Sequence, residues 1–349
     1  MTTAAVHPAA TPALLRRYRQ EIEVELRSLV DSRPAAFSPQ VRYQLGWVDE
    51  RGQALAAGGG KALRPSLLLL VCDGLGGERS QALPLAAAIE LAHNFSLLHD
   101  DIQDGDRERR HRPTAWVLWG VPQAINLGDA VFSLAMSALY SADERGLSPS
   151  RLLEAHRVLT EACLEMIEGQ QMDLSFEAED DVPLPQYLMM AERKTGALMG
   201  AALELGALAA EGGRDQVAAC RRAGRSLGLA FQIRDDCLSV WGDPSRTGKK
   251  TGGDILRKKK ALPIAYGLSQ AGARSAELRR LYGQNALSLE DVCRVRRLLT
   301  EVGALAFARR LTEELSETAL LELRSAGLAP WAQDEFRSLV DYLLQTQGG

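Results

Sequence analysis

The stretch from Leu97 to Asp104 carries the residues with the most evident chemistry. It places three carboxylates, those of Asp100, Asp101 and Asp104, directly after an apolar run. On a helix, Asp100 and Asp104 lie one turn apart on one face, where two carboxylates repel and raise each other's pKa. A divalent cation relieves that repulsion, and an all-oxygen ligand set suits Mg²⁺, which often also binds substrate phosphates. The competing interpretation is a solvated acidic helix end.

A second aspartate pair, Asp235 and Asp236, follows about 135 residues downstream. Facing helices of a bundle can direct such acids into one central cavity. Carboxylates and cations in one cavity are the combination that Mg²⁺-diphosphate recognition needs, because metal ions bridge carboxylates to phosphate oxygens while cationic side chains bind the rest. The available cations lie on four segments: Lys61 and Arg64, Arg109 and Arg110, Lys194, and Lys249 with its neighbours.

No covalent nucleophile is evident. The serines lack a G-x-S-x-G setting, and no cysteine stands beside a histidine. This suits a reaction in which metal ions help diphosphate to leave and a carbocation remains, without a covalent enzyme intermediate.

Composition narrows the class of protein. Of 349 residues, 46% are hydrophobic but only 5% aromatic, which favours an Ala/Leu-rich helical protein. The net charge of −4 argues against nucleic-acid binding. Five scattered cysteines show no disulfide framework and favour a reducing cytoplasm. The start lacks a signal peptide, and Gly196–Ala210, interrupted by Glu204, is too short for a transmembrane segment and predicts a buried helix.

The elements that must position these residues are all predicted to be helices, because no run alternates with period two. We expect an all-α protein: one large helical bundle of residues 13–349 around a central cavity, after a disordered tail of residues 1–12. The helix that delivers the first acids should run from Leu85 to His99, opened by Pro84. The other expected helices are Leu14–Val30, Ser66–Leu75, Asn126–Ala142, Arg151–Leu174, Leu184–Ala210 and Val217–Val240.

In this order the motifs resemble those of trans-type isoprenyl diphosphate synthases, the polyprenyl synthetase family, from Leu14 onward. The matching segments are Gly60–Pro65, Glu90–His93, Asp100–Asp104 with Arg109-Arg110, Gly169-Gln170, Lys194-Thr195, Phe231-Gln232, Asp235-Asp236, and Thr247–Lys249 leading to Asp254. The resemblance implies the isoprenoid synthase fold and a homodimer. It also implies a prenyltransferase that condenses isopentenyl diphosphate with dimethylallyl, geranyl or farnesyl diphosphate.

The resemblance further implies a role for each matching residue. Asp100 and Asp104 should bind two Mg²⁺ ions and Asp235 a third, with Mn²⁺ as a substitute; Asp101 and Asp236 should act indirectly or through water. The allylic diphosphate should be held by Arg109, Lys194, Lys249 and Lys259. Isopentenyl diphosphate should be held by Lys61, Arg64, His93 and Arg110. Thr195 and Gln232 should lie along the allylic tail, where their oxygen dipoles stabilise the cation.

Some of these residues could instead have a purely structural role. His93 could be a core histidine, and His99 is expected to be structural. Lys258 and Lys260, on either side of Lys259, could be solvated. Gln170 could contact metal-bound water or satisfy a buried helix.

Two departures from the family pattern stand out. Ser239 replaces the third aspartate of the second motif; Asp243, one turn further, lies on the same face if the helix persists. His111 follows the arginine pair where many relatives have glycine.

Product length should depend on the residues just before the first acids. The chain would extend along the helix towards its N-terminus, and one turn rises about 5.4 Å, close to one isoprene unit. Ser96 is small, whereas Phe95 is bulky enough to stop the chain. Members of the family with an aromatic residue five positions before the motif, a small residue next and no insertion in the motif resemble geranylgeranyl diphosphate synthases. The resemblance therefore implies a C20 geranylgeranyl product, with a C15 farnesyl product as the alternative. Phe95 could instead merely pack between helices.

The sequence argues against three other classes of protein. A class I terpene cyclase has no use for the isopentenyl site, and a non-catalytic synthase subunit tends to lose acids that are complete here. A His-Asp phosphohydrolase built on His99 and Asp100 would need another histidine a few turns upstream, and none lies between His7 and His93.

Overall fold

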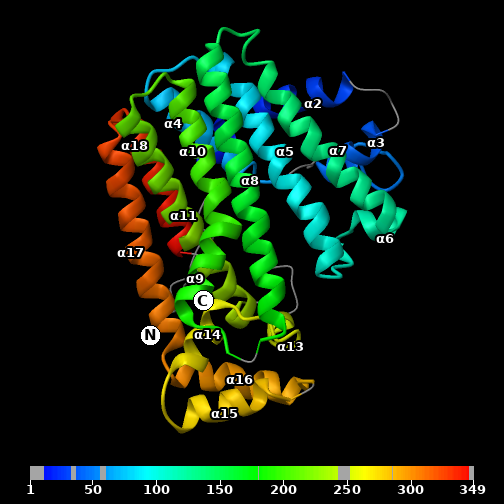
Figure 1. Cartoon of the computed structure of the whole chain (residues 1–349), viewed down its shortest axis with the longest axis vertical. Coiled ribbons are helices and arrows are strands. Elements are labelled where there is room, and N and C mark those ends of the chain that lie inside the picture. The colour runs from blue at the N-terminus through cyan, green and yellow to red at the C-terminus, as the bar shows by residue number, and fades with distance from the viewer. Residues whose placement is uncertain are drawn as a thin grey trace, which may run out of the picture.

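The computed structural model describes residues 12–32, 37–55, 60–179, 181–242, 252–284 and 286–345. Helices dominate these ranges, and the one sheet is a two-stranded antiparallel ribbon of β1 (Glu108–Arg109) and β2 (Arg112–Pro113). The all-α prediction is confirmed (Figure 1). Of the predicted tail, only Pro12 is described, and it is buried. The smaller and peripheral helices are α1 (Leu14–Arg17), α2 (Arg19–Asp31), α3 (Ser38–Gln44), α6 (Ala115–Trp119), α13 (Gly253–Leu256), α14 (Leu262–Ser269), α15 (Ala273–Tyr282), α16 (Leu289–Glu301), α17 (Ala304–Ser325) and α18 (Pro330–Gln345).

The core is built around α10 (Ala197–Ala209), whose residues are all buried. A helix that is apolar on every side must be surrounded, and α10 packs against α4 (Leu63–Gly74), α5 (Arg79–Gln103), α8 (Pro149–Glu177) and α11 (Arg214–Trp241). Small residues allow close contact: a Cβ on Gly206 would lie 2.3 Å from the Leu68 carbonyl oxygen of α4. The sequence prediction of a buried helix here is confirmed.

The helix that carries the first acids begins earlier than the sequence predicts. Pro84 does not open it: α5 starts at Arg79 and holds Pro84 inside its second turn. Proline lacks an N–H and clashes with the carbonyl four residues earlier, and that carbonyl belongs to Ser80 near the helix start. The helix is therefore 25 residues long and ends at Gln103, with Asp104 as its C-cap.

Two long helices flank α5. The next along the chain, α7 (Val121–Tyr140), starts after Gly120, which has φ 82°, and packs along α5. The following helix, α8, has the Ser148 hydroxyl accepting from the Arg151 N–H at its N-cap and Pro149 in its first turn. In Figure 1, α7 and α8 diverge from the turn that joins them, and α5 lies between them.

The predicted helix Leu184–Ala210 is interrupted. It begins as α9 (Leu184–Ala191), widens into the π-helical turn η1 (Glu192–Gly196), and continues as α10. The π-turn carries Lys194 and Thr195. Single π-turns inside α-helices occur often at functional sites.

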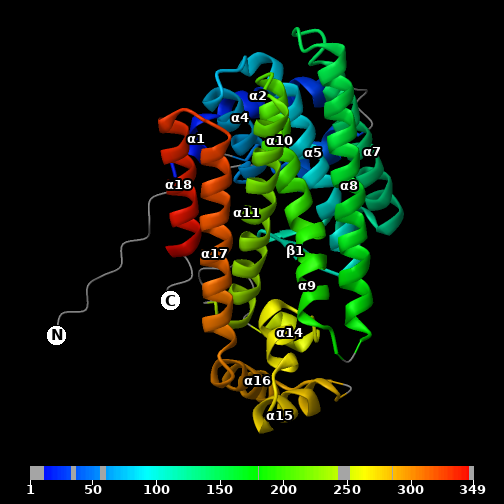
Figure 2. The same cartoon turned by 60° about the vertical axis from the view of Figure 1, so that its left-hand side comes forward.

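One end of the bundle has its own small core. Val240, Ile255 and Ile264 pack with apolar residues of α15 and α16, and these helices form the lower end in both views (Figures 1 and 2). Across the described ranges, none of the helices combines the length and the hydropathy that membrane crossing requires.

Candidate active site

The first aspartate motif, Asp100 to Asp104, stands at the C-terminal end of α5. The Asp101 side chain is only 3% exposed and accepts a hydrogen bond of 2.6 Å from the Arg109 Nε on β1. Burial raises the pKa of Asp101 to about 6, although the Arg109 charge opposes that shift. Burial also raises the pKa of Asp100, which Lys194 lowers and Asp104 raises further.

Asp104 is held by a lysine from a distant segment. Its Oδ2 accepts a 2.9 Å hydrogen bond from the Lys259 ammonium, which follows α13. Burial alone would raise the pKa of Asp104, but the Lys259 charge and hydrogen bond lower it. The neighbouring Arg257 binds Asp106 at 2.7 Å, so the segment after α13 is anchored to the end of α5 by two ion pairs.

Lys194 reaches the same motif from the other side. Its ammonium donates a 2.6 Å hydrogen bond to Asp173 Oδ2 near the end of α8. Burial would lower the pKa of Lys194, but the charges of Asp173 and Asp100 outweigh it and raise the pKa. The sequence analysis missed Asp173; the signal was an acid one turn after Gly169-Gln170.

A chain of hydrogen bonds fixes the second aspartate pair. The Thr195 hydroxyl donates to Gln232 Oε1 at 2.7 Å, and Gln232 Nε2 donates to Asp236 Oδ1 at 2.8 Å. The Asp236 Oδ2 accepts from the Tyr187 hydroxyl and from the Leu262 N–H. Burial raises the pKa of Asp236 to about 7 despite these donors. Asp236 thus orients Gln232, whereas Asp235 is exposed and accepts from Arg234 at 3.0 Å.

A group of cationic and neutral side chains gathers near the N-terminus of α4. Burial lowers the pKa of Arg64, and the charges of Glu90 and Asp235 oppose that shift. Burial, with the charges of Arg64 and Arg110, holds the pKa of His93 well below its usual value, so its ring is neutral at pH 7. The Arg64 Nε is buried without a hydrogen-bond partner.

Two features complete this group. Glu90, which the sequence analysis quoted without a role, is buried, and burial raises its pKa against the charges of Arg64 and Arg110. Arg110 has φ 52° and lies so close to Gly60 that a Cβ there would stand 2.8 Å from its Nη1. The glycine at position 60 therefore leaves room for the Arg110 guanidinium, which a larger residue would have to displace.

The other residues named from the sequence lie at the edges of these two groups or outside the described residues. Lys61 is exposed, with its ammonium 5.8 Å from the centre of the Tyr342 ring on α18. Lys249 and Asp243 lie outside the described residues. The Ser239 hydroxyl donates to the Asp236 carbonyl of its own helix at 2.8 Å. The Gln170 amide donates to Gln103 Oε1 at 2.9 Å and so joins α8 to α5.

The residues expected to limit product length face α7. Phe95 is 5% exposed and makes a T-shaped contact with Phe132 of α7, with ring centres 5.0 Å apart. His99 also packs on Phe95, at 5.7 Å, and its ring lies against Gly128. The Ser96 hydroxyl donates to the His93 carbonyl of its own helix. Phe132 was not foreseen, because its register against α5 depends on how the two helices pack.

The acids have the right chemistry for a divalent cation. Their donors are all oxygens, and Asp104 Oδ1 is buried without a hydrogen-bond partner. Within the described ranges no three acidic, histidine or cysteine side chains converge as a ready metal site. Asp101 and Asp104 are paired with Arg109 and Lys259 instead. The carboxylates of the first motif therefore have the chemistry to bind Mg²⁺. In this structure Asp101 and Asp104 instead form ion pairs with cationic side chains.

Comparison with known proteins agrees with the fold and the motifs. The polyprenyl synthetase family matches residues 46–299. The chain is 43% identical over 253 residues to a (2E,6E)-farnesyl diphosphate synthase of Mycobacterium tuberculosis, covering 72% of this chain and 69% of the relative. It is 37% identical over 319 residues to a geranylgeranyl diphosphate synthase of the same organism, covering 91% and 90%.

A solved structure extends this agreement to three dimensions. The crystal structure of a polyprenyl synthetase from Streptomyces coelicolor A3(2) superposes with a TM-score of 0.88 at 36% identity, covering 95% of this chain and 98% of that one. The chain belongs to the polyprenyl synthetase family. It is an enzyme of the prenyltransferase class.

Proposed function

We propose that this enzyme condenses isopentenyl diphosphate with an allylic diphosphate to give a short-chain trans-prenyl diphosphate, with Mg²⁺ as its metal. The observation that carries the proposal is that two cation groups meet two acid groups. Lys194 acts electrostatically on Asp100, and Arg64 acts on Asp235. Together, these two pairings supply the charges for two diphosphates and for metal ions between carboxylate and phosphate oxygens.

The assignment of residues to the two diphosphate sites follows from the family resemblance and from the contacts described above. Arg109, Lys194, Lys249 and Lys259 would hold the allylic diphosphate, and Lys61, Arg64, His93 and Arg110 would hold isopentenyl diphosphate. The neutral His93 can donate one hydrogen bond to a phosphate oxygen without adding charge. Mg²⁺ bound by Asp100, Asp104 and Asp235 would supply positive charge to the departing diphosphate, with Asp101 next to that set.

The chain's own residues then guide the carbon chemistry. Thr195 and Gln232 are hydrogen-bonded to each other, which fixes their relative orientation, and their oxygen dipoles would stabilise the allylic carbon that becomes positive. The double bond of isopentenyl diphosphate forms the new carbon–carbon bond, and a proton then leaves to the released diphosphate. No side chain of the described site needs to form a covalent bond.

For the product we propose a C20 chain. The basis is Phe95, which packs against Phe132 of α7 and stands next to the small Ser96. The relatives include farnesyl and geranylgeranyl diphosphate synthases alike, so a C15 product is the alternative that the experiment must separate.

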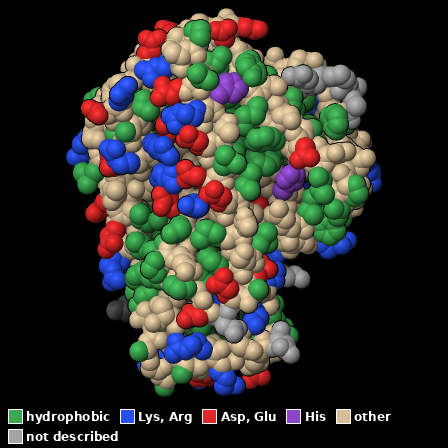
Figure 3. All heavy atoms as spheres, viewed as in Figure 1, with side chains coloured by type: hydrophobic (Ala, Val, Ile, Leu, Met, Phe, Trp, Pro, Cys, Tyr) green, Lys and Arg blue, Asp and Glu red, His purple; other side chains and the backbone are tan. Residues whose placement is uncertain are grey.

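A homodimer is part of the proposal. Six of the fourteen exposed large apolar side chains in the described ranges lie on α7 and α8, and Figure 3 shows hydrophobic side chains gathered over these helices. A second copy of this chain is the occupant that the family resemblance implies. The six side chains are Val121, Ile125, Tyr140, Leu153, Leu164 and Ile167.

The test is incubation with Mg²⁺, isopentenyl diphosphate and each of dimethylallyl, geranyl and farnesyl diphosphate, followed by chromatography of the products. We expect C20 prenyl diphosphate from all three starters. Accumulation of a C15 product would replace the length assignment. A hydrocarbon formed from an allylic diphosphate alone would identify a terpene cyclase, and no product from any starter would overturn the proposal.

A further inference from the structure

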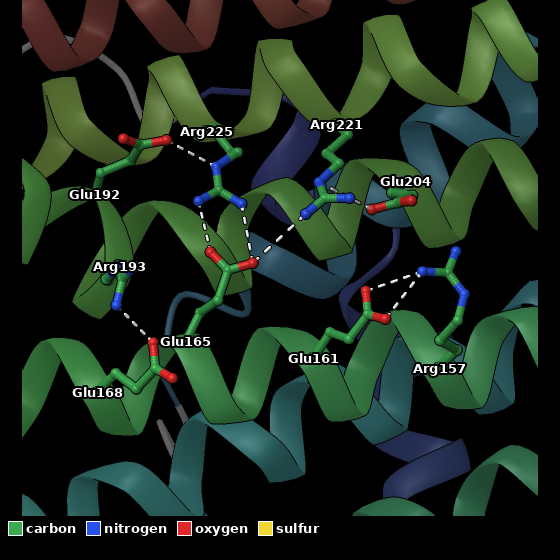
Figure 4. Close-up of polar contacts among 9 residues, drawn as sticks. All are labelled: Arg157, Glu161, Glu165, Glu168, Glu192, Arg193, Glu204, Arg221 and Arg225. Atoms are coloured by element: carbon green, nitrogen blue, oxygen red, sulfur yellow. Dashed lines mark hydrogen bonds and ion pairs between the residues drawn. The ribbon is translucent and has the colours of Figure 1, made fainter.

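Arg225 on α11 joins three elements around the π-turn that carries Lys194 and Thr195. Its Nε donates a 2.8 Å hydrogen bond to Glu192, the first residue of η1. Its Nη1 and Nη2 bind both oxygens of Glu165 on α8, at 3.3 and 2.5 Å. Figure 4 shows the guanidinium between these two carboxylates. One side chain of α11 therefore links η1 to α8.

The bridge has the features of a specific contact. The side chains of Arg225 and Glu165 are 22% and 25% exposed, and Glu192 is 43% exposed. A bidentate arginine–carboxylate pair fixes both distance and direction. Burial alone would raise the pKa of Glu165, but the hydrogen bond and charge of Arg225 lower it. Glu165 therefore stays ionised at neutral pH.

The backbone of η1 packs directly against the backbones of α8 and α11. On its α8 side, a Cβ on Gly169 would lie 2.3 Å from the Lys194 nitrogen. On its α11 side, a Cβ on Gly228 would lie 2.7 Å from the Gly196 Cα. Because η1 lies in direct backbone contact with both helices, a change in their separation also moves Lys194 and Thr195.

The bridge and the site residues use different sides of the turn. Glu192 and Lys194 are two residues apart, and residues at that spacing do not face each other on a helix. Glu192 binds Arg225, whereas Lys194 binds Asp173 and acts on Asp100. The three bridging side chains therefore act on the site through the backbone of η1.

We propose that Glu165, Arg225 and Glu192 are positioning residues that set the π-turn for the allylic diphosphate. They fix the distance between α8 and α11 and so the position of η1. At that position Lys194 can bind the diphosphate and Thr195 can donate its hydrogen bond to Gln232. This inference rests on the proposed function. The bridge should affect the allylic substrate alone, because within the described ranges the proposed isopentenyl residues form no hydrogen bond or ion pair with Glu165, Arg225 or Glu192.

The experiment compares Arg225→Leu with Arg157→Leu in the full-length enzyme. Arg157 is the matched control, since it pairs with Glu161 at 2.9 Å on the same α8 helix but does not touch η1 (Figure 4). We expect Arg225→Leu to raise the KM for the allylic diphosphate about tenfold or more and to lower kcat, because small misplacements of a binding group are costly. The KM for isopentenyl diphosphate should change less than about twofold, and Arg157→Leu should change neither constant.

Two further variants separate positioning from loss of fold. Glu192→Gln removes one charge from a partly exposed side chain and should raise the allylic KM in the same direction. The double variant with Arg225→Leu should be no worse than Arg225→Leu alone, because both changes break one bridge. Arg225→Lys, which keeps the charge, should recover part of the allylic affinity.

Each outcome decides one question. A lower melting temperature with both Michaelis constants unchanged would make the bridge merely structural and overturn the inference. An equal rise in both constants would also overturn it. Failure of the proposed function is distinct, because the unaltered enzyme would then form no prenyl product at all.

Discussion

The acids and cations of the site pair with one another across distant parts of the chain. Asp101 binds Arg109, Asp104 binds Lys259, and Asp173 binds Lys194. Apart from Asp173, these are the side chains that we propose for the metal and diphosphate sites. In the proposed function, substrate and metal binding would exchange one set of charge pairs for another, and the cations would already be close to their places before the substrate arrives.

The first prediction concerns Asp100. Asp100→Ala should lower turnover by roughly 10³-fold or more, because charge stabilisation of the leaving group depends on the metal that this carboxylate binds. Activity should require Mg²⁺, with Mn²⁺ as a substitute. Steady-state kinetics with and without a chelator measure both effects.

Asp143→Ala is the control, since this exposed acid lies in the turn after α7; it should leave turnover unchanged. Circular dichroism should show that both variants remain folded. Full activity in excess chelator would contradict the metal assignment.

The second prediction separates the two diphosphate sites. Arg64 has a buried Nε without a partner and stands beside His93 and Arg110. Arg64→Ala should raise the KM for isopentenyl diphosphate by about 10- to 100-fold, as the loss of a charged hydrogen bond predicts. The KM for the allylic substrate should change far less. Equal changes in both constants would show that the sites are assigned wrongly.

At the scale of elements, product length depends on the contact between α5 and α7. Phe95→Ala should remove the ring that meets Phe132 and shift the products to longer chains, while Ser96→Phe should shift them to shorter ones. Product chromatography measures the shift. Leu323→Ala on α17 is the control, because it also empties a buried position but lies on another helix. If neither substitution at positions 95 and 96 changes the products, the floor of the cavity lies elsewhere.

The elements also show how far the sequence could predict the site. The positions of Asp100 and Asp104 followed from helical spacing, and the helices around them were found in the right order. The π-turn at Lys194 was not predicted, because it depends on Gly169 and Gly228 bringing two other helices against it. Phe132 was missed for the same reason, because local spacing does not encode which helix faces which. Asp173, in contrast, lies one turn after Gly169 and could have been found from its spacing.

The predicted start of α5 was wrong because proline was taken as a marker of the first helical turn. Pro84 was expected to open α5, yet it lies in the second turn, where it provides no N–H for the Ser80 carbonyl. That carbonyl accepts a hydrogen bond from Arg145 Nη1 at 3.3 Å instead. Ser239, the departure from the family pattern, donates its hydroxyl to the Asp236 carbonyl of α11. It therefore satisfies its own helix rather than replacing the missing carboxylate.

At the scale of the whole molecule, exposed apolar side chains of α7 and α8 lie on the outside of the described bundle. Leu164 and Ile167 of α8 are 57% and 48% exposed, and Ile125 of the adjacent α7 is 44% exposed. Contiguous exposed apolar surface is characteristic of an interface, and homodimer interfaces are the more apolar kind. The helices beneath this face, α5 and α10, hold the aspartate motif and the core. Dimerisation would therefore support the wall of the site from outside.

The last prediction tests that interface. Leu164→Glu combined with Ile167→Glu should convert the dimer to a monomer, because each carboxylate buried without a partner costs several kcal/mol. Sedimentation velocity at micromolar concentration measures the change in mass. Leu289→Glu on α16 is the matched control: that side chain is 76% exposed at the far end of the bundle and should leave the dimer intact. A double variant that sediments like the unaltered protein would place the interface on another face, and a dissociated but fully active variant would show that the second copy does not support the site.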